Sequence, residues 1–254
     1  MKLYFDVGGT NISIYCKKKG TFTFINEIDT LVNSFQNQID LLLSHIPFEE
    51  DPNLHFALPG VVSANGDVSL TNIDYKGNFK DFIQSNFFPK HLTLMNDADA
   101  FTYGVSRILN DKLVCGVIFG TGIGVGLVNS GNLVESKRGG FGEIGMMLEN
   151  QFNSKKVEEY IKSKGYSFNN LESFNFNDIN KIKSDLKPIY IHIKKIFTFI
   201  DFIYSPDVIA ISGSFSKFIK FLFSIFNYYH DCEIHYFPSK YTIYGLDVYN
   251  SSIL

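Results

Sequence analysis

Two glycine-rich segments hold the residues of this chain that are best suited to chemistry. The first is Asp6-Val-Gly-Gly-Thr10-Asn11, directly after a short apolar run, and the second is Phe119-Gly-Thr-Gly-Ile-Gly124. Glycines let backbone N–H groups approach a phosphate closely, and Thr10 adds a hydroxyl donor. Each segment alone could be a plain hairpin turn. Together they predict a nucleotide held between two parts of the chain, with Asp6 helping to hold the accompanying Mg²⁺.

Several acids stand near predicted strand ends or glycines. Asn96-Asp97 follows an apolar run and precedes a predicted helix. Asp97 there fits either a helix N-cap or a carboxylate that orients or deprotonates a substrate hydroxyl, and its position leaves both open. Glu143 is flanked by Gly142 and Gly145, which is also typical of a surface turn. Glu158, in a predicted helix, favours a solvated helix face when taken alone.

Gly213 ends the apolar run Ile209-Ala-Ile-Ser212. A glycine between a strand and a helix suits the phosphate or adenosine side of a nucleotide site. It is equally typical of an ordinary strand–helix connection, so this motif alone decides nothing.

The elements that must position these residues follow from hydrophobic spacing and turn signals. In the first half, alternation and a turn at Gly20 predict three antiparallel strands, and apolar runs or helical spacing predict the rest. The predicted strands are Leu3–Val7, Asn11–Cys16, Thr21–Ile25, Leu54–Leu58 and Leu92–Met95, and the predicted helices are Leu31–Ile46, Phe79–Phe88 and Asp97–Leu109.

The second half repeats this order of elements with little shared sequence. Its predicted strands are Leu113–Phe119, Ile123–Val128 and Val208–Ser212, and its predicted helices are Lys155–Lys164, Ile189–Tyr204 and Gly213 to about Tyr229. The Asn-rich segment Ser167–Lys187 is predicted to be mainly loop. We expect two α/β units, residues 1–110 and 111–254, which meet at Asn110-Asp111-Lys112.

Composition narrows the class of protein. The chain has 254 residues, 45% of them hydrophobic and 19% charged, and a net charge of −3, which argues against nucleic acid or an anionic membrane as partner. Lys17-Lys-Lys19 is predicted to be a solvated hairpin tip. No signal segment or membrane-length apolar run is present, which predicts a cytoplasmic protein. The three cysteines predict free buried thiols, and Cys232 with His235 lacks a second ligand pair for a metal.

Taken in order, the motifs resemble those of the ROK family of bacterial glucokinases and related hexose kinases, within the actin-like ATPase superfamily. The motifs that carry the resemblance are Asp6-Val-Gly-Gly-Thr10, Pro59-Gly60, Asn96-Asp97-Ala98, Gly120-Thr-Gly122, Gly142-Glu-Ile-Gly145 and Ser212-Gly213, and Tyr244-Gly-Leu-Asp247 stands near the family's last Gly-Ala-Ala helix. The resemblance implies an α/β, two-lobed, ribonuclease H-like fold. Each lobe would be a mixed sheet with flanking helices, and a cleft would lie between the lobes.

The resemblance also implies a role for each matching residue. Asp6 would hold magnesium through water, and Asp97 would be the base that accepts the proton of the attacking hydroxyl. Sugar ligands would be Asn96, Glu143, Glu158 and, as a weaker candidate, Asn72. The first phosphate loop would be Gly8, Gly9, Thr10 and Asn11, the second Gly120, Thr121 and Gly122, and the adenosine side Gly213.

Two departures from the family pattern bear on the acceptor and on zinc. Met146 stands where the family usually has a histidine that contacts the sugar, so the pocket is expected to lack one hydrogen-bonding group. An unpaired buried hydroxyl costs about 1–3 kcal/mol. The segment Met147–Lys156 has none of the cysteines of zinc-binding members, so no zinc site is expected.

The activity that the resemblance implies is transfer of the γ-phosphoryl group of ATP, with Mg²⁺, to a hexose, most simply the 6-hydroxyl of glucose. Two alternatives stay open: a catalytically weak sugar sensor, and a kinase of another acceptor such as N-acetylmannosamine, fructose or pantothenate. The resemblance also implies a homodimer.

Overall fold

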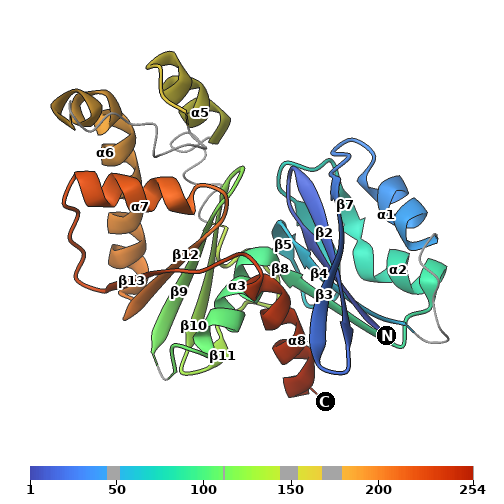
Figure 1. The fold of residues 1–254 in the computed structure, drawn as a ribbon. Coiled ribbons are helices and arrows are strands. Elements are labelled where there is room, and N and C mark those ends of the chain that lie inside the picture. The colour runs from blue at the N-terminus through green and yellow to red at the C-terminus, as the bar shows by residue number, and fades with distance from the viewer. Residues whose placement is uncertain (45–51, 111, 144–153, 168–178, 254) are drawn as a thin grey trace.

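The computed structural model describes residues 1–44, 52–110, 112–143, 154–167 and 179–253 of the chain. Two five-stranded mixed sheets form its framework, and Figure 1 shows them side by side with two helices between them. In each sheet three strands form an antiparallel meander, and two further strands continue from the meander's first strand in parallel. The repeated order of elements predicted from the sequence is therefore a repeated sheet topology.

The first sheet has the order β3-β2-β1-β4-β8. Its strands are β1 (Lys2–Val7), β2 (Asn11–Lys18), β3 (Thr21–Asp29), β4 (Asn53–Leu58) and β8 (His91–Asn96). Helices α1 (Phe35–Ser44) and α2 (Phe79–Phe87) bury apolar side chains against it, and a small sheet of β5 (Gly60–Val62), β6 (Asp67–Leu70) and β7 (Lys76–Asn78) follows β4. Strand β3 extends beyond the predicted Ile25 to Asp29, and α1 begins at Phe35 rather than at the predicted Leu31, which is exposed.

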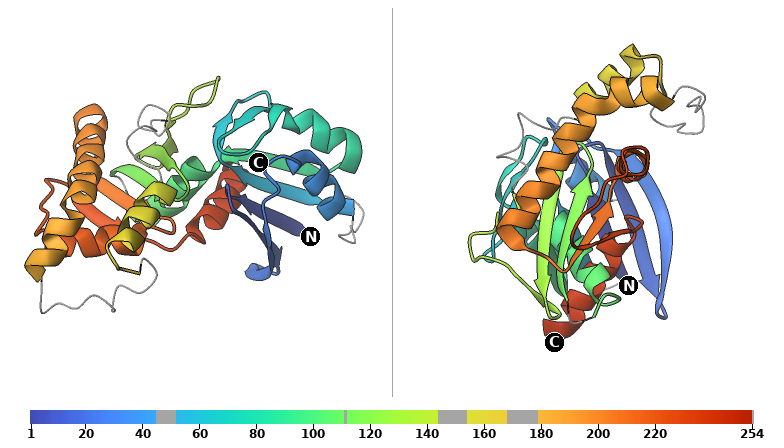
Figure 2. Two further views of the ribbon diagram at one scale, coloured as in Figure 1. Left: turned by 90° about the horizontal axis from the view of Figure 1, so that it is seen from above. Right: turned by 90° about the vertical axis from the view of Figure 1, so that its left-hand side faces the viewer.

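The second sheet has the order β11-β10-β9-β12-β13. Its strands are β9 (Leu113–Phe119), β10 (Ile123–Asn129), β11 (Asn132–Leu133), β12 (Val208–Ser212) and β13 (Glu233–Tyr236). Helices α5 (Ser154–Ser163), α6 (Ile179–Tyr204) and α7 (Ser216–Ile225) share its hydrophobic core. The two views of Figure 2 show α6 and α7 on one face of this sheet.

Helix α6 corrects the prediction of loop as far as Lys187. It begins at Ile179 and continues through Pro188 to Tyr204. A proline inside a helix costs about 3 kcal/mol because it removes a backbone donor and crowds the preceding turn. Ile182 and Leu186, before the proline, are buried in the same core as Ile193 after it, and this burial offsets the cost. Residues 168–178 of the predicted loop lie outside the described part of the chain.

Two helices pack tightly against each other between the sheets: α3 (Asp97–Ser106) and α8 (Tyr241–Ile253). A Cβ atom on Gly104 would lie 2.2 Å from the carbonyl oxygen of Tyr241, and one on Gly245 would lie 1.7 Å from that of Ala100. Only glycine permits this approach of the two backbones. Helix α3 ends earlier than the predicted Leu109, and α7 ends at Ile225 rather than near Tyr229.

Helix α8 also contacts β1 and β4 of the first sheet. Its Asp247 forms ion pairs with Lys17 at 2.5 Å and Lys2 at 3.5 Å and accepts a 2.6 Å hydrogen bond from Tyr4. Lys17 is therefore part of this contact, and the prediction of a fully solvated lysine tip was wrong for that residue. None of the helices in the described ranges combines the length and apolar character needed to cross a membrane.

Candidate active site

The first glycine-rich loop connects β1 to β2, and local hydrogen bonds fix its shape. The Gly8 N–H donates to the Asn11 carbonyl at 2.8 Å, and the Thr30 hydroxyl donates to the Gly8 carbonyl at 2.8 Å. A Cβ atom on Gly8 would lie 3.1 Å from the Asn11 carbonyl oxygen, so a side chain there would strain the turn. The loop is a tight turn with little space for anything but glycine.

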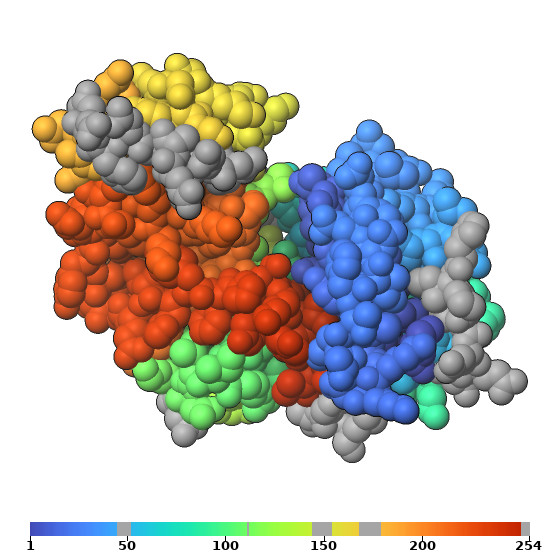
Figure 3. Space-filling model, viewed as in Figure 1, coloured from blue at the N-terminus to red at the C-terminus, as the bar shows by residue number. Residues whose placement is uncertain are grey.

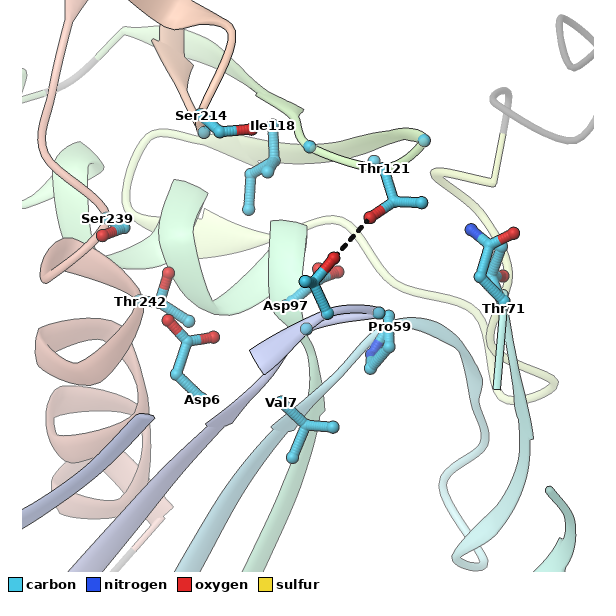
Figure 4. Close-up of a pocket in the computed structure, with 18 of the residues that line it drawn as sticks. Asp6, Val7, Pro59, Thr71, Asp97, Ile118, Thr121, Ser214, Ser239 and Thr242 are labelled. Atoms are coloured by element: carbon cyan, nitrogen blue, oxygen red, sulfur yellow. Dashed lines mark hydrogen bonds between the residues drawn. The ribbon is translucent and has the colours of Figure 1, made fainter. Parts of the chain in front are cut away.

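The second glycine-rich loop connects β9 to β10 and faces the first. The Gly120 N–H donates to the Gly122 carbonyl at 3.0 Å. The hydroxyl oxygens of Thr10 and Thr121 lie 3.4 Å apart, and Figure 4 shows this contact. The two loops that the sequence places more than a hundred residues apart therefore meet at one point.

A cavity of about 320 Å³ lies where these loops meet. In Figure 3 a hollow is visible between the two halves of the molecule, and Figure 4 shows the cavity's lining. Both sheets contribute to it. Of the predicted site residues, those that line it are Asp6, Gly8, Gly9, Thr10, Asn11, Asn72, Asp97, Gly120, Thr121, Gly122, Glu143 and Gly213.

The start of α3 is built around Asn96, which caps the helix. Its side-chain oxygen accepts hydrogen bonds from the N–H groups of Ala98 at 2.9 Å and Asp99 at 3.0 Å. Its amide nitrogen donates to the Gly60 carbonyl at 2.8 Å and to Glu143 Oε1 at 3.1 Å. Asn96 is therefore the N-cap of α3, and Asp97, for which the sequence left this role open, is not. It does not line the cavity, but it holds Glu143 there.

Asp97 is the first residue of α3, and its carboxylate faces the cavity. Its Oδ1 accepts a hydrogen bond from the Ala98 N–H at 2.8 Å. Burial raises the pKa of Asp97 well above 3.8, and the charges of Asp6 and Glu143 raise this pKa further. A carboxylate with a raised pKa is a stronger base, which suits proton abstraction from a hydroxyl.

Asp6 lies near the end of β1, and its side chain also faces the cavity. Burial and the nearby charge of Glu27 raise its pKa from 3.8 to about 7. Within the described ranges the cavity lining holds three acids, Asp6, Asp97 and Glu143, and no lysine, arginine or histidine. A divalent metal ion held by carboxylate and water would offset the negative charge of these acids and of an anionic ligand such as a triphosphate, so the residues fit such an ion.

Gly213 lies in the tight connection between β12 and α7. Its φ is +96°, and a Cβ atom there would lie 2.1 Å from the Phe119 carbonyl oxygen. The neighbouring Ser212 lines the cavity, and its buried hydroxyl oxygen has no hydrogen-bond partner in the part of the chain that the structure describes. A ligand with a polar group would satisfy that oxygen.

Sequence reasoning missed several polar residues of the cavity. Ser13, Thr71, Ser212, Ser239 and Thr242 line it. Ser13 could have been found from strand pairing, because it lies opposite Asp6 in the register of β1 and β2. Ser239 lies just before α8 and Thr242 in its first turn, and neither had a signal of its own.

Glu158 is, with Asn96, one of two predicted site residues that the structure places outside the cavity lining. It lies in α5, does not line the cavity, and forms an i,i+4 ion pair with Lys162 at 2.8 Å. Its predicted sugar contact stays a prediction. Met146 lies outside the described part of the chain, and so do residues 147–153 of the segment that lacks the zinc-binding cysteines.

Comparisons with known proteins agree with the resemblance in the motifs. No family model matches the chain. N-acetylmannosamine kinase of Haemophilus influenzae is 29% identical over 157 residues, which is 58% of this chain and 52% of that protein. The chain thus spans about half the length of the curated relatives it matches.

Solved structures match over nearly the whole chain. A candidate N-acetylmannosamine kinase from Listeria monocytogenes has a TM-score of 0.75 at 16% identity and covers 99% of both chains. A ROK family glucokinase from Streptomyces griseus, solved with glucose and AMPPNP, has a TM-score of 0.73 at 15% identity and covers 97% of this chain and 98% of its own. The predicted resemblance is confirmed: the chain has the mixed α/β fold of ROK-family sugar kinases.

Proposed function

We propose that this chain, which has the fold of ROK-family sugar kinases, is an ATP-dependent sugar kinase that phosphorylates a hexose hydroxyl. One observation carries the proposal. Two glycine-rich loops, one from each sheet, and the acids Asp6, Asp97 and Glu143 surround a single cavity. Backbone donors suit phosphates, and acids suit a cation and a sugar, so the cavity has parts for both substrates of a phosphoryl transfer.

In the proposed mechanism the two loops bind the phosphates of ATP, with Gly8, Gly9, Thr10 and Asn11 on one side and Gly120, Thr121 and Gly122 on the other. Gly213 lies on the adenosine side. Asp6 would hold Mg²⁺ through water, and this ion supplies charge neutralisation to the phosphates when it is bound. Phosphoryl transfer depends mainly on positioning and charge, which this arrangement provides.

Asp97 is proposed as the base. It accepts the proton of the attacking hydroxyl at its carboxylate as the oxygen approaches phosphorus. Glu143 binds other sugar hydroxyls, and Asn96 positions Glu143 through the 3.1 Å hydrogen bond. Asn72, which lines the cavity, and Glu158, from α5, are retained as weaker sugar-binding candidates.

The same proposal includes the division into two lobes, their closure and the oligomeric state. We propose that residues 1–110 and 111–254 act as two lobes of an actin-like ATPase whose closure on the cavity excludes water. Helix α8 packs on α3 and the first sheet and would tie the two lobes together. A homodimer in the cytoplasm is proposed from the family resemblance alone.

Two acceptors are favoured by specific observations. The motif resemblance favours glucose, phosphorylated at its 6-hydroxyl. The curated relative and one structural neighbour named above are described as N-acetylmannosamine kinases, which favours an N-acetylhexosamine as the second candidate.

A coupled ADP-release assay over a panel of sugars tests the proposal. The panel contains glucose, mannose, fructose, N-acetylglucosamine and N-acetylmannosamine, and pantothenate is the non-sugar control. Sugar-dependent ADP release supports the kinase, and the acceptor with the highest kcat/KM identifies the substrate. A sugar-dependent thermal shift without turnover would indicate a sensor instead.

A further inference from the structure

Glu27 lies in a row of polar residues that crosses the first sheet. In the strand register Asp6 of β1 lies opposite Ser13 of β2, and Ser13 lies opposite Glu27 of β3. Residues opposite each other on neighbouring strands point to the same face of a sheet. Asp6 and Ser13 both line the cavity, so Glu27 lies on the side of the sheet that faces it.

The Glu27 carboxylate is held in place by two hydrogen bonds. Its Oε2 accepts from the Ser13 hydroxyl at 2.8 Å, and its Oε1 accepts from the Asn11 side-chain amide at 3.0 Å. Asn11 belongs to the first glycine-rich loop and lines the cavity. A long exposed side chain would not keep one orientation without such contacts, so the negative charge has a defined position beside the loop.

The Asp6 carboxylate, in contrast, accepts no hydrogen bond from any residue of the described ranges, although it is enclosed by protein and faces the cavity. An enclosed carboxylate without a donor is suited to interact with a cation, directly or through water. Two strand spacings, about 10 Å, separate the backbones of Asp6 and Glu27. This separation favours a role for Glu27 through water and charge rather than direct coordination of the same ion.

We propose that Glu27 is a positioning residue of the divalent-cation site: it orients Ser13 and Asn11 and adds a negative charge near Asp6 that makes the cavity prefer metal-bound over metal-free nucleotide. This inference rests on the proposed function, because it assumes that the cavity binds a nucleotide. It adds a residue that neither glycine-rich motif contains.

Loss of the Glu27 charge should change the preference for metal-bound nucleotide, which loss of a purely structural contact would not do. Removal of a negative charge beside the phosphates should weaken binding of the metal complex and leave metal-free nucleotide binding unchanged or stronger. Loss of loop structure would weaken both forms to the same extent. For charges about 10 Å apart near a protein surface, the expected change in the preference is about three- to tenfold.

The test is isothermal titration of ADP into the full chain, with saturating Mg²⁺ and again with EDTA. Glu27→Gln should lower the ratio of the two affinities by about three- to tenfold. Glu27→Asp, which keeps the charge, should retain most of the ratio. Glu159→Gln removes the same charge from the exposed face of α5 and should leave the ratio at the wild-type value.

The outcomes separate the two proposals. A wild-type protein that binds no ADP, or binds it without regard to Mg²⁺, overturns both the nucleotide site and the inference. A wild-type preference for Mg²⁺-ADP that Glu27→Gln leaves intact overturns the role of Glu27 alone. An equal loss of both affinities in Glu27→Gln also overturns it, because Glu27 would then only support the loop. Titration of Mn²⁺ followed by its electron paramagnetic resonance signal gives a second readout without turnover.

Discussion

Two acids at strand β1, one within the strand and one packed against it, have opposite shifts in pKa. At Tyr4, Asp247 of α8 accepts a 2.6 Å hydrogen bond from the tyrosine and forms ion pairs with Lys17 and Lys2. Burial alone would raise the pKa of Asp247, but the hydrogen bonds from Lys17 and Tyr4 outweigh burial, so this pKa is lowered. Two residues further along the strand, Asp6 faces the cavity with Glu27 as its charged neighbour, and its pKa is raised to about 7.

This difference in pKa distinguishes an acid that stabilises the fold from an acid whose negative charge has no partner in the described chain and could be balanced by a cation. Asp247 is satisfied by groups of the chain itself and fixes α8 against the first sheet. Asp6 is satisfied by nothing in the described ranges and costs stability while it is charged. Raised pKa values in a cavity are typical of functional sites, although ion-pair networks also shift pKa values. The following changes test whether this division holds.

The largest effect is expected at Asp97, the other acid of the cavity with a strongly raised pKa. Asp97→Asn should bind sugar with near-normal affinity, because the amide keeps the shape of the carboxylate. It should turn over at least about a hundredfold more slowly, because the base is lost. The coupled ADP-release assay measures turnover, and calorimetry measures sugar binding.

Asp99 provides the matched control on the same helix. Burial and the charges of Glu135 and Glu143 raise its pKa to about 7, yet it does not line the cavity. Asp99→Asn should therefore keep turnover within a few-fold of wild type. Equal losses in both variants would assign the effect to the stability of α3 and remove Asp97 from its role as base.

Asp247→Asn tests the paired acid. Lys17 and Tyr4 would lose a charged hydrogen-bond partner in a largely buried place, and hydrogen bonds to charged groups contribute about 1.5–3 kcal/mol. For a chain of this size each kcal/mol corresponds to about 2–4 °C in Tm. Differential scanning calorimetry should show a clear fall in Tm. Glu233→Gln, which breaks the exposed pair with Lys112, should leave Tm unchanged.

Asp6→Asn should act in the opposite direction. The folded-state pKa of about 7 lies above the ordinary value of 3.8, so the unfolded chain releases its proton first and wild-type stability falls as the pH rises from about 4 to about 7. The neutral amide avoids this loss. Its gain in Tm should be absent near pH 4 and largest above pH 7, in the absence of metal and nucleotide. A lower Tm at pH 8 would show that Asp6, like Asp247, has a stabilising partner.

The same two acids show how far the sequence could go. Asp6 was predictable as a site residue because an apolar strand, two glycines and a threonine stand next to it in the chain. The fold's order of elements followed from apolar runs, and β9 has the predicted bounds Leu113–Phe119. The Asp247–Lys17 pair joins residues 230 positions apart, and no local pattern indicates such a contact.

Other differences between the predicted and the observed structure also have physical causes. Pro188 is normally a stop signal, and only the burial of Ile182 and Leu186 in the second core shows that the helix continues across it. Glu27 had no signal in its neighbours, because its role depends on the register of three strands. Glu158 was assigned by motif, while its observed partner is Lys162, one helical turn away.

The smallest effect is expected at His55, which is next to Tyr4, the tyrosine that donates a hydrogen bond to Asp247. It is fully buried, stacks on Tyr4 with ring centroids 4.5 Å apart, and its Nδ1 lies 3.0 Å from the Thr93 hydroxyl. Burial, with a smaller contribution from Lys2, lowers its pKa from 6.5 to about 4. Because the unfolded chain takes up this proton first, the stability contributed by neutral His55 is complete above pH 6.5 and is lost as the pH falls toward about 4.

The experiment compares urea unfolding of wild type and His55→Gln across this pH range. The variant is expected to be less stable at pH 7, because it loses the stacked ring, and its free energy of unfolding should depend less steeply on pH than that of wild type. The raised pKa values of Asp6 and Asp99 change stability in the opposite direction with pH, but they are common to both proteins and cancel in the difference. Parallel pH curves would mean that His55 has the same pKa in the fold as in the unfolded chain, and that burial against Tyr4 does not hold its ring neutral.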